Sequence, residues 1–188
     1  MRGSLSTKRK FVRYLIVIAV IIASGAFVSL ILSSRGNSSG TEKKEVLKSA
    51  NAIKDIQKEF SISLLDEKGK EINGVTMRLE NVELREEIIV QGQKASSLPG
   101  RAFLVVNMKI VNSLSQAIEV NTKDYLRLEM KENEWLAPDI HNDPVLVQAI
   151  STKPTRVAFP VDSNLNRFAL QVGEIKKDKE KLEIDFSK

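Results

Sequence analysis

The chain has 188 residues, 42% of them hydrophobic and 28% charged, which is enough for one domain and a short extra segment but not for two full domains. It has no cysteine and one histidine, which excludes a disulfide framework, a thiol nucleophile, a cysteine–zinc site, a lipid-modified cysteine and any multi-histidine metal site. The net charge of +5 comes entirely from residues 1–32, because the other 24 bases are matched by 24 acids, so we expect no nucleic-acid partner.

Residues 14–32 are nineteen consecutive uncharged positions, YLIVIAVIIASGAFVSLIL. A helix of that length spans about 28 Å at ~1.5 Å per residue, close to the roughly 30 Å hydrocarbon core of a bilayer. Bases precede the run and only Arg35 follows it closely, and such a bias marks the cytoplasmic side. The sequence therefore predicts a basic cytoplasmic tail over residues 1–10, a transmembrane helix over residues 11–32 and an extracytoplasmic remainder. The membrane-anchor positions that we single out are Tyr14, Leu15, Ile22, Phe27 and Leu32.

Cleavage of this segment is the alternative to a permanent anchor. Ser24-Gly25-Ala26 offers the small residues that a signal peptidase reads. The apolar run continues past that point to Leu32, so cleavage would leave an apolar mature N-terminus. We therefore favour an uncleaved signal anchor.

The segment over residues 33–59 is expected to join the membrane to the folded part. Residues 33–41 are rich in Ser, Gly and Asn, which is typical of a flexible linker. Apolar residues at steps of three and four follow, at Val46, Ala50, Ile53, Ile56 and Phe60. That period predicts a short amphipathic helix. Fewer than three heptads are available, so we favour a helical spacer over a self-associating stalk.

Beyond Phe60 the apolar period becomes two, which is typical of half-buried strands. Further alternating stretches cover residues 75–84, 102–112, 126–130, 145–150, 157–161, 168–172 and 182–186. The first of these changes parity near Asn81, which predicts a β-bulge there. The stretch over residues 102–112 is apolar on both faces in its first half, as a central strand would be. Pro160 cannot donate to a ladder, so residues 156–161 are expected at an edge.

This pattern of about eight or nine short strands, with a turn about every ten residues, predicts an all-β fold. We expect an immunoglobulin-like antiparallel β-sandwich over residues 60–188, because each one-faced sheet needs a second sheet to cover it. An NTF2-like or other α+β domain is the alternative, and it would need a long helix in this region.

Residues 100–112, GRAFLVVNMKIVN, resemble the central strand of a bacterial family of unknown function. Its members are immunoglobulin-like domains that are secreted or tethered to the membrane. Residues 124–138 resemble the next hairpin of that family, with Glu132-Asn133-Glu134 in place of its Gly-containing turn, and residues 156–161 and 168–172 are similar to its closing strands. The resemblance implies a fold and a location, and it supplies no catalytic residue.

The densest polar cluster lies between two prolines and consists of Asp139, His141, Asn142 and Asp143. Oxygen and imidazole ligands this close could hold a divalent cation, with Asp139, His141 and Asp143 as the candidate ligands. The spacing matches no EF-hand loop, and Asx and Pro residues are also typical of turns, so we favour a turn. His141 as a general base would lack a marked nucleophile, since no elbow motif singles out a serine.

We therefore expect a non-catalytic, membrane-anchored binding module of the cell envelope, with no cofactor. Its partners would be the membrane and another envelope protein or ligand. Trp135, the only tryptophan, is expected either to fill the core or to contact that partner. A bitopic assembly factor of a secretion or cell-envelope machine is the alternative, and an extracytoplasmic enzyme is a further one.

Overall fold

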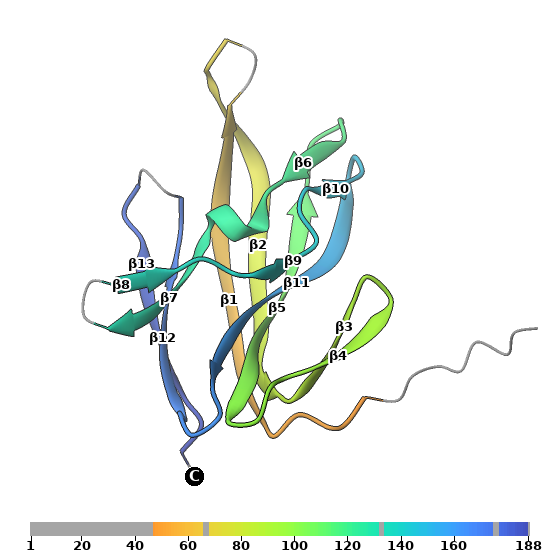
Figure 1. Cartoon of the computed structure of the whole chain (residues 1–188). Coiled ribbons are helices and arrows are strands. Elements are labelled where there is room, and N and C mark those ends of the chain that lie inside the picture. Colours follow the sequence, from red (N-terminus) through yellow and green to blue (C-terminus); the bar gives the residue numbers. More distant parts are fainter. Residues whose placement is uncertain (1–46, 66–67, 132–133, 175–176, 188) are drawn as a thin grey trace, which may run out of the picture. The chain divides into compact units, whose positions relative to one another are not determined.

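The computed structural model describes residues 47–65, 68–131, 134–174 and 177–187 (Figure 1). These residues form thirteen strands and one 3-10 turn, η1 (Thr122–Asp124). The strands are β1 (Ala52–Leu65), β2 (Glu71–Arg85), β3 (Glu87–Val90), β4 (Gln93–Ser96), β5 (Arg101–Asn112), β6 (Ile118–Val120), β7 (Leu126–Lys131), β8 (Glu134–Leu136), β9 (Ile140–His141), β10 (Val145–Val147), β11 (Ser151–Asp162), β12 (Arg167–Val172) and β13 (Glu180–Asp185).

The predicted cytoplasmic tail, transmembrane helix and linker lie outside the described residues, and so do all five anchor positions. In the part of the chain that the structure describes, no helix is both long and apolar enough to cross a bilayer.

Two antiparallel sheets form the body of the domain. One has the strand order β1-β2-β5-β11-β9 and the other β13-β12-β7-β8, while β6–β10 and β3–β4 are separate two-stranded ribbons. Apolar side chains from both sheets meet in one continuous core, to which β5 contributes Val106 and Met108, and β7 and β12 contribute Leu128 and Leu170. The expected all-β antiparallel sandwich is confirmed, and the only helical element among the described residues is η1.

The predicted bulge in β2 is confirmed. The register with β5 shifts by one residue between the pairs Leu79↔Met108 and Asn81↔Asn107. Because of this extra residue, apolar side chains of both parities reach the core, and Val75, Met77, Leu79, Val82 and Leu84 are all buried.

β5 is the central strand of its sheet, as its two apolar faces predicted. Leu104 and Val106 face the core, while Val105 on the other face is only 2% exposed. Val105 packs with Ile88 of β3 and Ala158 of β11 in a small second cluster. The β3–β4 hairpin therefore covers the outer face of the sheet at this point.

The predicted helix before Phe60 is wrong from Ala52 onward, because these residues form β1, and the sandwich begins at Ala52 instead of residue 60. Ala52, Ile56 and Phe60 all pack against the core. Positions four apart share a face in a helix and in a strand alike, but Ile53, which the helical period placed on the apolar face, is 59% exposed because positions three apart lie on opposite faces of a strand. The alternation was hidden because Lys54 and Lys58 occupy the positions between Ala52, Ile56 and Phe60.

The expected edge at residues 156–161 is only partly correct. β11 pairs with β5 along its length, but β9 covers its other side at Val157 and Ala158. The strand expected over residues 145–150 is also shorter than predicted, since β10 ends at Val147.

The strand registers define two ends of the sandwich. We call the end at which Ala52 pairs with Leu84, and Arg101 with Asp162, the proximal end, because the described chain enters β1 there. We call the opposite end, which holds Leu65, Asn112 and Ser151, the distal end. Figure 1 shows the start of the described chain and the C-terminus at the proximal end, and β6 and β10 at the distal end.

Candidate functional site

The fold brings only part of the predicted polar cluster over residues 139–143 close together. Asp139 is exposed, whereas the Asp143 side chain is 1% exposed. The Asp143 carboxylate accepts hydrogen bonds from Thr122 N (2.8 Å), Thr122 Oγ1 (2.6 Å) and Lys123 N (2.8 Å). It thus ties η1 to the segment before β10.

His141 lies beside this carboxylate on β9. Its Nδ1 atom is 3.5 Å from Asp143 Oδ2 and accepts the backbone N–H of Asp143 at 3.3 Å. No group of three or more histidine, aspartate or glutamate side chains in the described ranges is arranged to hold a metal ion. The donors around Asp143 are supplied by the chain itself.

Trp135 lies on β8, an outer strand of the smaller sheet. It is half-buried and pairs with Glu129, whose carboxylate meets Lys181 Nζ at 2.8 Å. The neighbouring Leu136 packs against the core instead. Trp135 therefore lies on the face of the sheet that points away from the core, and its contact with a partner stays a prediction.

Three large apolar side chains are exposed at the distal end, on the β1–β2 hairpin, on β10 and in the connection between β10 and β11. Leu65, Leu146 and Ile150 are 67%, 50% and 77% exposed. A groove of about 620 Å³ opens between the end of the β1–β2 hairpin and β6, with Leu64 and Ile118 among its lining residues. This end of the molecule is the candidate binding surface, and the sequence patterns did not single it out.

Ile150 is the most unusual residue of this surface. Its φ is +48°, in the left-handed region that a β-branched residue rarely adopts. The backbone is fixed there because Ile150 N donates to Leu114 O at 3.0 Å, in the connection between β10 and β11. The Ile150 side chain is exposed and does not pack in the core, so its burial does not offset the energetic cost of this backbone conformation. The sequence does not indicate this conformation, because an isoleucine beside a predicted strand is assigned to that strand.

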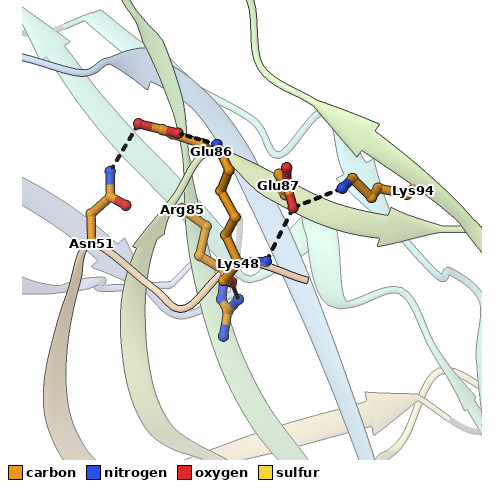
Figure 2. A network of polar contacts seen from close by, with 6 residues as sticks. All are labelled: Lys48, Asn51, Arg85, Glu86, Glu87 and Lys94. Carbon is orange, nitrogen blue, oxygen red and sulfur yellow. Dashed lines mark hydrogen bonds and ion pairs between the residues drawn. The ribbon is translucent and has the colours of Figure 1, made fainter. Parts of the chain in front are cut away.

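The proximal end carries a polar network around the start of the described chain (Figure 2). Lys48 N donates to Glu87 Oε2 (3.1 Å), and Lys48 O accepts from Arg85 Nη1 (3.0 Å). Lys48 Nζ lies 3.4 Å from Glu86 Oε2, and Asn51 N donates to Leu84 O at 2.8 Å. We call Lys48, Arg85, Glu86 and Glu87 the Lys48 clamp, since they hold the chain just before it enters β1.

Glu87 is the most buried group of the clamp. The backbone N–H of Lys48 and the ammonium of Lys94, 3.1 Å away, hold the pKa of Glu87 below its usual range, although burial acts in the opposite direction. The ionised Glu87 carboxylate therefore holds the chain in place through its Oε2 atom.

A second polar cluster ties β1 to the loop between β12 and β13. Ser63 N donates to Glu174 Oε1 (3.0 Å), and Lys177 Nζ lies 2.8 Å from Glu71 Oε1 and 3.2 Å from Glu174 Oε2. Burial alone would raise the pKa of Glu174, but the Ser63 N–H and the Lys177 ammonium outweigh it, so that this pKa is lowered. Hydrogen bonds to Glu71 and Glu174 raise the pKa of Lys177. We call these residues the Glu174 latch.

No family model and no curated protein matches the sequence. Among solved structures, the chain is similar to an uncharacterized β-sandwich protein from Clostridium difficile, with 13% identity, a TM-score of 0.46 and coverage of 77% of this chain and 99% of the other. It is also similar to a conserved hypothetical protein from Bacillus anthracis, with 11% identity, a TM-score of 0.44 and coverage of 71% and 99%. A functionally unknown protein from Listeria monocytogenes has 11% identity, a TM-score of 0.44 and coverage of 76% and 90%. All three are bacterial proteins without an assigned function.

Proposed function

We propose that this chain is a non-catalytic, immunoglobulin-like binding module of the cell envelope, anchored by residues 11–32, whose distal end docks another envelope protein. The positive charge of the N-terminal tail and the uncharged run over residues 14–32 support a membrane anchor and an extracytoplasmic location of the β-sandwich. Loops at the end of a rigid sandwich are a common place for recognition, because the two sheets position them.

Ile150 is the observation that carries the proposal. An exposed isoleucine at positive φ costs backbone energy and gains almost no burial, so its side chain has no role in stability. Burial of the same side chain against a partner would recover about 1.5–3 kcal/mol of hydrophobic free energy. Leu65 and Leu146 are further exposed apolar side chains at the distal end.

Site-specific photo-crosslinking in cells tests the docking surface. A benzophenone amino acid is placed at Leu65 or Leu146 of the full chain, and at Leu98 as the control. Leu98 is 74% exposed but lies in the loop next to Arg101, at the proximal end. We expect a discrete protein adduct from the two distal positions and none from Leu98, and we expect the Ile150→Asn variant to lose the adduct.

Two outcomes would contradict the proposal. Equal adducts from Leu98 would mean that the distal end is not preferred. Adducts that survive the Ile150→Asn change would mean that the exposed isoleucine does not contribute to binding. Thermal denaturation of each variant shows that it is folded before its crosslinking is interpreted.

A further inference from the structure

We propose that β1, held by the Lys48 clamp, carries mechanical tension between the N-terminal segment and a partner bound at the distal end. The inference rests on the proposed function for the place of the partner, while the resistance to force is a property of the domain itself. Its basis is that the described chain begins at one end of the sandwich and the exposed apolar surface lies at the other.

The direction of β1 determines how such a force acts. β1 runs from Ala52 at the proximal end to Leu65 at the distal end and is antiparallel to β2, with eleven registered pairs between them. A pull on the chain before Ala52, opposed at the distal end, acts along the strand. All ladder hydrogen bonds are then stretched at once, whereas a sideways pull at the proximal end breaks one pair after another.

A bulge in β1 opposes sliding of the ladder. Gln57 has a φ of +49°, and the register shifts between Asp55 and Lys58. Gln57 Nε2 donates a hydrogen bond to Glu80 O at 3.1 Å. The bulge of β1 is therefore held opposite the residue of β2 at which the β2–β5 register shifts. Bulges fix register, and β1 cannot move by two residues without losing this match.

Links to the second sheet also hold β1 against an axial pull. Lys58 forms an ion pair with Glu180 of β13. The Glu174 latch holds Ser63 through its backbone N–H, and Lys177 Nζ reaches Ser63 Oγ at 3.0 Å. These contacts lie along the middle and distal part of β1, so an axial pull stretches them together with the ladder.

The Lys48 clamp determines where the force enters. Both backbone polar groups of Lys48 are held by side chains at the β2–β3 junction, and Asn51 N bonds to Leu84 O. A pull on Leu47 therefore reaches the sheet at the start of β1, with the strand still aligned to β2.

Force spectroscopy on the full chain in detergent tests this inference directly. The natural chain has no cysteine, so two introduced cysteines fix the points to which DNA handles are attached. The pair L47C/Q148C pulls along β1, whereas L47C/N164C pulls between two points at the proximal end. Leu47 is half-buried, and Gln148 and Asn164 are both exposed. We expect the first pair to rupture at a several-fold higher force than the second.

Lys58→Ala and Glu174→Gln then test the lateral links. We expect each to lower the rupture force of L47C/Q148C and to leave that of L47C/N164C unchanged, because the sideways pull opens the ladder before it reaches them. Arg167→Ala is the matched control, since it removes an exposed ion pair with Asp185 that is not on β1. A circular-dichroism melt confirms that each variant is folded.

Equal rupture forces for the two cysteine pairs would overturn the inference. So would an Arg167→Ala effect as large as that of Lys58→Ala. The force measurement needs no partner, so its failure leaves the docking proposal intact, and a failure of the crosslinking leaves the measured force intact.

Discussion

The left-handed backbone at Ile150 leads to a prediction about stability. Asn adopts positive φ more readily than a β-branched residue does, and little burial is lost because the side chain is 77% exposed. We expect Ile150→Asn to raise the free energy of unfolding by about 1 kcal/mol. Urea denaturation measures it. A drop in stability would mean that the isoleucine serves the fold, and the argument for a docking surface would lose its basis.

The buried carboxylate of Asp143 gives a second prediction. Asn at this position presents one oxygen to three donors and adds donors of its own, so one or more hydrogen bonds to η1 are lost. We expect Asp143→Asn to lower the free energy of unfolding by about 2–3 kcal/mol. Asp139→Asn is the matched control, with a change expected within ~0.5 kcal/mol because the side chain is exposed. A strong stabilisation of the natural chain by added calcium or zinc would instead support a cation site.

The Glu174 latch predicts how stability depends on pH. The pKa of Glu174 in the folded chain lies below its ordinary value of 4.5, so ionised Glu174 stabilises the fold above that value. The contribution is lost as the pH falls through the lowered pKa, because the proton then binds more tightly to the unfolded chain. We expect urea midpoints to fall on acidification below about pH 5, and less steeply in Glu174→Gln. Glu134→Gln, at an exposed position on β8, should leave the pH dependence of the urea midpoint as steep as in the natural chain.

At the scale of elements, the sequence was most informative where one apolar face is unbroken. β5, β7, β12 and most of β2 follow from alternation alone, and the parity change at Asn81 is enough to locate a bulge. The strand β1 was not predicted because Lys54 and Lys58 alternate with the residues that contact the core. Lys58 reaches Glu180 on the other sheet, an interaction that local sequence cannot indicate.

The candidate site was less predictable than the fold. The acidic loop around Asp143 resembles a cation site because oxygen ligands gather there, yet its donors come from Thr122 and Lys123, about twenty residues earlier. The exposed residues of the distal surface come from β1 and from β10 with its connection to β11, which are far apart in the sequence. The positive φ of Ile150 is imposed by the connection to β11, so periodicity could not find it.

The β3–β4 hairpin is an element with its own small core. Its turn is Gln91-Gly92, with φ of +50° and +79°, and Ile88 packs on Val105 and Ala158. Because this cluster is separate from the main core, we expect Ile88→Ala to speed amide exchange in residues 87–96 while the β2–β5 ladder stays protected. Hydrogen exchange read by mass spectrometry measures both. An equal loss of protection in β5 would show that the hairpin and the sandwich open as one unit.

At the scale of the whole molecule, residues 45–188 form one compact unit with its own core. We expect the full chain to stay with the membrane fraction after a carbonate wash, whereas a chain that begins at residue 42 is released and unfolds at the same temperature. The first result follows from the uncharged run over residues 14–32. Release of the full chain by carbonate would argue against the anchor.

The bulge at Gln57 has a further consequence for how copies of this chain behave together. β1 is a fourteen-residue outer strand, and a flat strand of that length would invite another copy to add to the sheet and start a polymer. The kink at Gln57 and the carboxylate of Glu174 on Ser63 N interrupt that template. We therefore expect this backbone irregularity and the loop between β12 and β13 to oppose edge-to-edge pairing of two copies.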